Sequence, residues 1–145
     1  MLLNEEKLIL NFSLFNNWEE KYEYLIELGE DICFIDPEKK TPKHLIQGCQ
    51  SKVWLDFEFK NDKLYFYGDS DALISKGLVA LIIELYSGNS PKEILTHQDN
   101  FFEKINLKEH LSMTRSNGLS MMIKKIKKYA YEQLNKNGLR NKTTR

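Results

Sequence analysis

Apolar and polar residues alternate between Lys52 and Lys60, with the period of two that is typical of a strand with one buried face. The pair Asn61-Asp62 follows, and both residue types tolerate the positive φ angles of a tight two-residue turn. A strand-like run from Lys63 to Tyr67 then returns, so the pattern predicts a β-hairpin. Aromatic residues on both of its faces indicate that one face packs on helices and the other is partly covered.

Two segments before the hairpin have the apolar spacing of helices. The first runs from Leu3 to Phe15. The second begins after Asn17, which is expected to cap it. Gly29 lies close to its end and is expected to act as a stop signal.

A nearly continuous apolar segment from Asp71 to Tyr86 predicts a central helix that is buried on most sides. Gly77 in its middle costs about 1 kcal/mol relative to alanine, which indicates close approach by another element. Asp69 and Asp71 lie at its start, where at least one of the two carboxylates is expected to accept a hydrogen bond from the first helical amides.

Residues 87–114 combine turn residues with short helical pieces, including a capped helix start at Ser90-Pro91. The last long helix is predicted to begin near Ser116 and to end at 135–138. These elements predict one domain, 1–134, followed by a disordered tail, 135–145. The expected fold class is α+β, with a small antiparallel sheet and helices packed mainly on one of its faces.

A chain of 145 residues with 41% hydrophobic and 29% charged residues is typical of one globular domain. Its formal charge is zero, so no global field points to a nucleic-acid or membrane partner. The charges are nevertheless segregated: residues 1–40 hold ten acids and four bases, whereas residues 124–145 hold eight bases and one acid. The sequence shows neither a run of about 20 apolar residues nor a secretory signal, so a cytoplasmic protein is expected.

Cys49 is the candidate for chemistry, because it lies in a turn-forming segment shortly before the first strand. Gly48 allows the backbone to turn sharply ahead of the sulfur, and Gln50 and Ser51 add hydrogen-bonding groups after it. A free thiol with a pKa of about 8.5 is only about 3% thiolate at neutral pH, so its surroundings decide whether it reacts. From residue types alone, an inert buried cysteine is the alternative to a reactive one.

Cys33 lies in a short apolar run without an adjacent base or glycine, and we expect it to be a packing residue. Neither a CxxC pair nor a cysteine–histidine cluster with zinc spacing is present, and two cysteines are too few for a cluster scaffold. His44, His97 and His110 are scattered along the chain. A stand-alone thiol enzyme, a peroxidase or hydrolase with Cys49 as nucleophile and His44 or His110 as base, stays open as an alternative that no sequence pattern supports.

The segment Gly48-Cys49-Gln50-Ser51-Lys52-Val53-Trp54 resembles the signature around the working cysteine of the SufE family, with no mismatch at its fixed positions. The related CsdE branch differs just after the cysteine, so Gln50-Ser51 favours SufE proper. The resemblance continues in order from about residue 5 to residue 130, through the segments Asn17–Tyr22, Glu27–Gly29, Gly68–Ala72, Lys76–Leu78 and Arg115–Leu119.

This resemblance implies that the chain is a sulfur carrier rather than an enzyme. Cys49 would take sulfur, as a persulfide, from a SufS-like cysteine desulfurase, stimulate that enzyme, and deliver the sulfur to the SufBCD scaffold for iron–sulfur cluster assembly. Pyridoxal phosphate would belong to the desulfurase, so no cofactor is expected on this chain. A CsdE-like acceptor for a different desulfurase is a further alternative, and the chain is expected to be a monomer or homodimer.

The resemblance also implies a fold akin to that of IscU-type scaffold proteins, with a third strand near Leu45–Gln47. Asp71 and Arg115 occupy polar positions of family-like segments, and we expect both to support the Cys49 loop or its docking surface, as Gly48, Gln50 and Ser51 would. Thr114 stands where the family usually has serine, a change that keeps a hydroxyl group. The Cys49 thiol is expected to face inward in the free protein, because an exposed thiol would oxidise.

Overall fold

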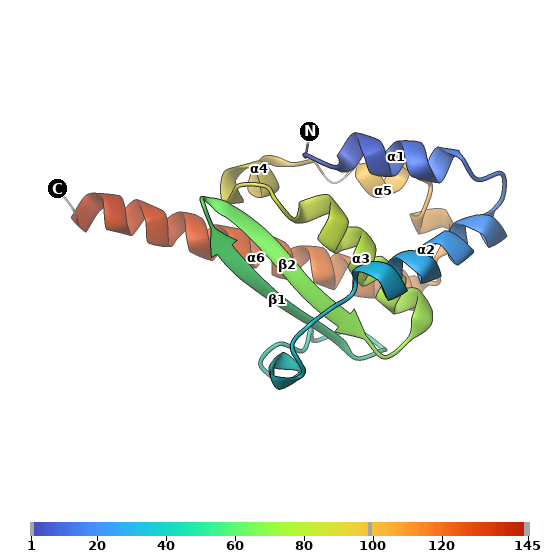
Figure 1. Ribbon diagram of the computed structural model, residues 1–145, viewed down its shortest axis with the longest axis horizontal. Coiled ribbons are helices and arrows are strands. Elements are labelled where there is room, and N and C mark those ends of the chain that lie inside the picture. Colours follow the sequence, from blue (N-terminus) through green and yellow to red (C-terminus); the bar gives the residue numbers. More distant parts are fainter. Residues whose placement is uncertain (1, 99, 144–145) are drawn as a thin grey trace.

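The computed structural model of the protein describes residues 2–98 and 100–143, without the side chains of Lys108 and of residues 137–143. The elements follow the predicted order, with two helices, a β-hairpin, a central helix, short helices and a long final helix (Figure 1). Their bounds are α1 Glu5–Ser13, α2 Trp18–Ile32, β1 Val53–Lys60, β2 Lys63–Ser70, α3 Leu73–Tyr86, α4 Pro91–Thr96, α5 Phe101–Lys104 and α6 Met113–Thr143, with 3-10 turns at Pro37–Lys39 and Lys108–His110. The predicted α+β class is confirmed.

The predicted β-hairpin is confirmed, with β1 and β2 antiparallel and paired along their whole lengths. Asn61 and Asp62 have φ angles of 53° and 63°, as the tight turn requires. One face of the hairpin lies against α3 and α6 (Figure 1) and buries alternate residues, among them Val53, Leu55, Leu64 and Phe66. The other face is partly covered, since the Lys40 ammonium lies 5.2 Å from the centre of the Trp54 ring.

The third strand expected near Leu45–Gln47 is reduced to an isolated bridge. Leu45 pairs with Trp54, and the Ile46 N–H donates to the Val53 C=O at 2.8 Å. The chain then turns at Gly48, whose φ of 88° does not continue a strand. The described part of the chain therefore contains a sheet of two full strands.

Two glycines allow α2 and α3 to pack closely. A Cβ added at Gly77 would lie 2.5 Å from the Leu25 carbonyl oxygen, and one added at Gly29 would lie 2.9 Å from the Gly77 nitrogen. Close approach at Gly77 is thus confirmed. Gly29 lies close to the end of α2, as predicted, but it does not stop the helix. The helix continues to Ile32, because a glycine costs a helix only about 1 kcal/mol and this contact with α3 offsets it.

Neither aspartate before α3 caps this helix, so that prediction was also wrong. The cap position is Ala72, and no side chain bonds the first helical amides there. Asp71 instead accepts a hydrogen bond from the Lys52 N–H, and Asp69 forms an ion pair with Lys40 at 2.8 Å. Both carboxylates therefore bind partners from distant segments, and these contacts connect the start of α3 to the hairpin and its flanking loops.

The last helix, α6, continues to Thr143, past the segment 135–138 where the sequence predicted its end and the start of a disordered tail. The prediction that the helix ends at 135–138 is therefore wrong, because the described residues up to 143 are helical. Residues 144–145 lie outside the described residues. A single glycine costs a helix only about 1 kcal/mol, and the sequence around Gly138 includes leucine, lysine and arginine, which are good helix formers.

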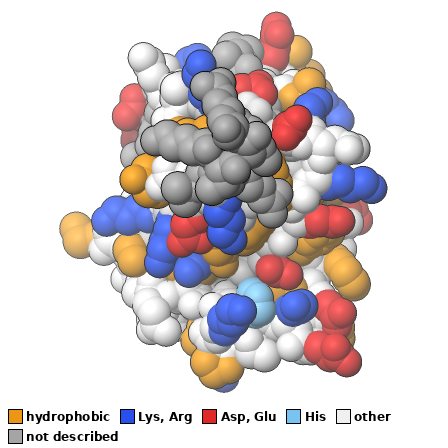
Figure 2. Space-filling view, turned by 90° about the vertical axis from the view of Figure 1, so that its left-hand side faces the viewer, with side chains coloured by type: hydrophobic (Ala, Val, Ile, Leu, Met, Phe, Trp, Pro, Cys, Tyr) orange, Lys and Arg blue, Asp and Glu red, His pale blue; other side chains and the backbone are white. Residues whose placement is uncertain are grey.

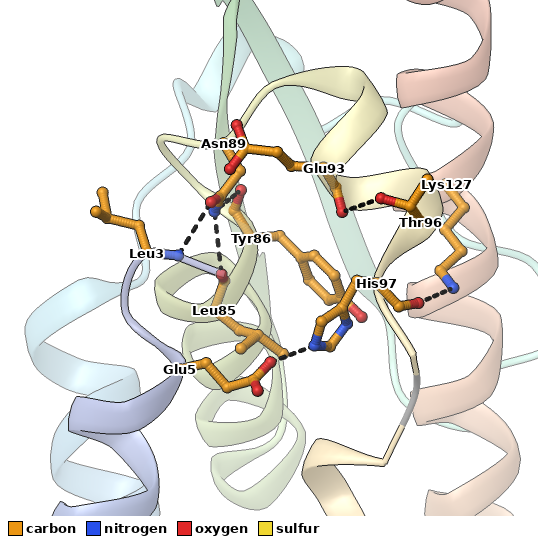
Figure 3. A network of polar contacts seen from close by, with 9 residues as sticks. All are labelled: Leu3, Glu5, Leu85, Tyr86, Asn89, Glu93, Thr96, His97 and Lys127. Carbon is orange, nitrogen blue, oxygen red and sulfur yellow. Dashed lines mark hydrogen bonds and ion pairs between the residues drawn. The ribbon is translucent and has the colours of Figure 1, made fainter. Parts of the chain in front are cut away.

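A buried polar cluster joins the N-terminal helix to the segment after α4 (Figure 3). The Glu5 carboxylate pairs with the His97 ring, and their side chains are only 4% and 6% exposed. Asn89 accepts a hydrogen bond from the Leu3 N–H at 3.0 Å, and Lys127 of α6 donates to the His97 C=O at 3.5 Å. The cluster therefore connects α1, the end of α4 and α6.

Figure 2 shows the face toward which α6 runs. Among the coloured side chains of this face, Lys and Arg lie beside Asp and Glu, with hydrophobic groups between them. No helix among the described residues is both long enough and apolar enough to cross a membrane.

Candidate functional site

Cys49 lies in the loop between the Leu45 bridge and β1, and this loop rests on α6. The Cys49 Sγ donates a long hydrogen bond to the Gly118 C=O, 3.8 Å away. A Cβ at Gly118 would lie 3.7 Å from the sulfur, an ordinary van der Waals contact, so the thiol lies directly against this turn of α6. The thiol is half-buried and faces α6, which agrees with the inward orientation expected from the sequence.

Gly48 makes the turn that directs the sulfur toward α6. Its φ of 88° lies in the left-handed region that favours glycine. A Cβ on Gly48 would also lie 3.3 Å from the Met121 Cγ, so a larger residue would press on α6. This geometry gives Gly48 a physical reason to support the loop.

Burial raises the pKa of the Cys49 thiol above its ordinary value. Desolvation disfavours the thiolate, and the thiolate is the nucleophilic form. The resting loop therefore holds the sulfur mainly as a protonated, weakly reactive thiol. A change in its surroundings is needed before it reacts quickly.

A cavity of about 240 Å³ opens beside Cys49, between its loop, the start of α3 and the start of α6. Its base is apolar and buried, and its rim is polar apart from the exposed Leu73. The base includes Val53, Leu78 and Met122, and the rim includes Gln50, Ser51, Thr114 and Arg115. The fold thus brings the residues after Cys49 together with Arg115, which is distant in the sequence.

Asp71 fastens the end of the Cys49 loop to the start of α3. Its Oδ1 accepts a hydrogen bond from the Lys52 N–H at 3.0 Å, and its own N–H donates to the Lys52 C=O at 3.2 Å. The Ser70 hydroxyl donates to the same carbonyl at 2.8 Å. Asp71 does not line the cavity, and its contacts with the Cys49 loop are those to Lys52.

Arg115 lies in the first turn of α6, exposed to solvent at the rim of the cavity. Among the described residues it has no carboxylate partner, so the surface ion pair that would explain it as a structural residue is not formed there. Its positive charge is available to a negatively charged group that approaches Cys49.

Comparison with known proteins connects this site to a family. The model of the SufE family, described as an Fe-S metabolism associated domain, matches residues 6–130. The chain belongs to the SufE family. A solution structure of a hypothetical protein from Thermus thermophilus has the same fold, with a TM-score of 0.77 over 93% of this chain and 99% of that chain at 18% identity. The family match associates the chain with iron–sulfur metabolism, and the solved structure supports the fold alone.

The second cysteine of this SufE-family chain has different surroundings. The Cys33 Sγ donates to the Lys76 C=O at 3.1 Å, at the junction of α2 and α3. Burial, and after it the negative charge of Asp69, raises the pKa of this thiol to about 12. Cys33 does not line the cavity beside Cys49. These contacts fit the packing role that we predicted.

The three histidines are engaged away from Cys49. His44 lies 3.5 Å from the Asp56 carboxylate, His110 stacks on Trp18 with 3.8 Å between ring centres, and His97 belongs to the buried cluster of Figure 3. None of them lines the Cys49 cavity. The described residues also contain no group of three or more side chains placed to hold a metal ion. This part of the chain therefore offers Cys49 no histidine base in its resting position.

Sequence reasoning missed one exposed apolar residue that lines the cavity, Leu73, and one that precedes the lining residue Thr114, Met113. Leu73 lines the cavity although it is 60% exposed, and Met113, next to the rim residue Thr114, is 81% exposed. Large exposed apolar side chains that gather beside a hollow are typical of binding surfaces. Both residues lie in the first turn of a helix, ahead of the residues that the helix buries in the core. This position was the available signal that their side chains are exposed.

Proposed function

We propose that this chain accepts sulfur on Cys49 from the persulfide of a pyridoxal-phosphate cysteine desulfurase and passes it to a SufBCD-type scaffold. The observation that carries the proposal is the SufE-type segment around Cys49, whose thiol lies at a cavity with a polar rim. The pyridoxal phosphate belongs to the desulfurase, and this chain contributes the accepting thiol. Removal of sulfur frees the desulfurase for its next turnover, so the carrier also acts as an activator.

The transfer is a thiol–persulfide exchange. The Cys49 thiolate attacks the outer sulfur of the desulfurase persulfide, and a new S–S bond forms to Cys49. The S–S bond within the donor breaks, and the desulfurase cysteine leaves as a thiolate. The Cys49 proton goes to solvent or to the departing thiolate, and no external oxidant or reductant is required.

Movement of the loop prepares Cys49 for this attack. Gly48 provides the flexible point before the sulfur, while the bonds between Asp71 and Lys52 hold the chain after it. The hydrogen bond from Sγ to the Gly118 C=O is long and weak, so its loss costs little when the sulfur leaves α6. When the sulfur leaves α6, the burial that raises its pKa is reduced, so the thiolate becomes easier to form.

The rim of the cavity provides the docking surface in this proposal. Leu73 and Met113 offer exposed apolar area, and Arg115 offers a positive charge to the persulfide or to an acidic group of the desulfurase. All of these residues come from one copy of the chain, so a monomer suffices and a homodimer is compatible. The exchange requires a reducing compartment, such as the cytoplasm.

The test is intact-protein mass spectrometry after incubation with a cysteine desulfurase and free cysteine. We expect an adduct of roughly +32 Da, one sulfur atom, on the wild-type chain and on Cys33→Ser. Cys49→Ser should show none, because a hydroxyl cannot form the S–S bond. An adduct that survives in Cys49→Ser and disappears in Cys33→Ser would reject the assignment.

A further inference from the structure

A second hollow, of about 220 Å³, lies beside the Cys49 loop. Leu45, Ile46 and Gln47 form one wall, and residues of α6 form the other, namely Met121, Lys124, Lys125 and Lys128. We name it the basic groove. It shares no lining residue with the Cys49 cavity, but its residue Met121 lies against Gly48 and so connects the groove to the Cys49 loop.

The basic groove has three lysines at its wall and no carboxylate among its lining residues. Lys124 and Lys128 form no ion pair within the described part of the chain, and Lys125 lies 5.2 Å from the centre of the Tyr129 ring. Three like charges without a counterion repel one another, so a negatively charged occupant is favoured. The remaining walls are mainly apolar, which requires an occupant that carries apolar side chains as well.

The loop wall of the basic groove is also an open strand edge. The Leu45 bridge uses the N–H of Ile46 and the C=O of His44, which point toward β1. In an antiparallel pair, the backbone groups of alternate residues point the other way, so those of Leu45 and Gln47 face away from β1. The Leu45 N–H donates to the Pro42 C=O at 3.3 Å, which leaves the Leu45 C=O and the N–H and C=O of Gln47 as the open groups of this edge. Within the described residues, the backbone of Gln47 forms no hydrogen bond with another backbone group. An open edge of this kind pairs with an extended chain.

We propose that the basic groove binds an extended, acidic segment of a partner polypeptide. The segment adds a short strand along Leu45–Gln47 and places carboxylates at Lys124, Lys125 and Lys128. Its alternate apolar side chains face the apolar walls. A partner held here lies next to the Cys49 loop, and only this consequence for sulfur transfer rests on the proposed function.

The probe is a fluorescein-labelled ten-residue peptide in which valine alternates with glutamate, titrated with the full chain and followed by fluorescence anisotropy. We expect saturable binding that weakens as salt is added. Lys124→Glu combined with Lys128→Glu should weaken binding at least about tenfold, because two attractions become repulsions. The matched control is Lys60→Glu combined with Lys136→Glu, which makes the same charge change at exposed lysines outside the groove and should alter affinity less than about twofold.

A second probe tests the strand-like mode. The same peptide with alternate backbone nitrogens methylated keeps its charges but cannot pair along a strand edge, and it should bind at least about tenfold more weakly. Equal losses in the two double variants, or full affinity for the methylated peptide, would overturn the proposal. Tighter binding of a single-stranded oligonucleotide of equal charge would assign the lysines to nucleic acid instead. Because neither desulfurase nor cysteine is present, the outcome is independent of sulfur transfer.

Discussion

The two cysteines of this chain are both half-buried, and each donates to a backbone carbonyl, yet their surroundings differ in one respect that decides their chemistry. Cys33 lies where α2 meets α3, and the contact at Gly29 and Gly77 presses these helices together. Cys49 lies in a loop, and its Sγ is 3.8 Å from the Gly118 carbonyl oxygen of α6. Burial raises the pKa of both thiols, but Cys33 is held at the contact of two packed helices, whereas Cys49 is held by a loop.

The largest expected effect follows when each cysteine is replaced in an assay of desulfurase turnover. Cys49→Ser should abolish the stimulation of sulfide release, because it cannot accept sulfur and the desulfurase persulfide persists. Cys33→Ser should keep most of the stimulation, since the Cys33 thiol only bonds the Lys76 carbonyl. The rate of sulfide release with a thiol reductant measures both, and stimulation retained by Cys49→Ser would contradict the proposed carrier role.

Alkylation by iodoacetamide gives a second, smaller contrast between the two thiols. A pKa near 12 lowers the thiolate fraction of Cys33 at neutral pH by about a thousandfold relative to an ordinary thiol, so Cys49 should react at least about tenfold faster. Addition of a desulfurase that cannot donate sulfur should accelerate only Cys49, because docking draws its loop outward. Peptide mapping by mass spectrometry reports each rate. Fast alkylation of Cys49 that the partner leaves unchanged would rule out the gating.

The sequence was sufficient for the elements with strong local signals. The Asn61-Asp62 turn, the Asn17 cap and the capping box that starts α4 depend on a few neighbouring residues, and the structure has all of them. Gly77 was also interpreted correctly, because a glycine in the middle of an apolar helix costs stability unless another element packs closely against it.

The misplaced features depend on contacts that are distant in the sequence. The sequence around Gly29 predicts a helix stop, because its neighbour Gly77 lies in another helix. The sequence around Asp71 predicts a helix cap, because its hydrogen bond to Lys52 forms only when α3 meets β1. At the site, the family-like segment identified Cys49, whereas the cavity, the free charge of Arg115 and the exposure of Leu73 required the folded chain.

Loss of a loop contact should weaken sulfur acceptance without a comparable loss of stability. Asp71→Ala removes the hydrogen bond to the Lys52 N–H, and Arg115→Ala removes the charge at the cavity rim. Each should slow formation of the Cys49 adduct several-fold, with a change in the free energy of unfolding of about 1 kcal/mol or less for these exposed groups. Rapid-quench mass spectrometry and chemical denaturation measure the two quantities.

Two exposed residues away from the site serve as controls for these variants, Asp31→Ala and Lys92→Ala. Neither control should change the rate of adduct formation. If the rates of the site variants fall only in proportion to lost stability, Asp71 and Arg115 are structural residues.

The smallest expected effect concerns stability at alkaline pH. Because the folded chain holds the pKa of Cys33 at about 12 while the unfolded chain titrates near 9, the unfolded state loses this proton first as pH rises. The contribution of Cys33 is therefore complete below about pH 9 and is lost progressively toward about pH 12. Above about pH 9, the free energy of unfolding of the wild type should thus fall more steeply with pH than that of Cys33→Ala, by at most about 1.4 kcal/mol per pH unit. Thermal unfolding at a series of pH values measures both slopes. Cys49→Ala should change this slope less, because its loop can turn outward and let water stabilise the thiolate before the fold is lost; an equal change in both variants would show that the two thiols are held equally firmly.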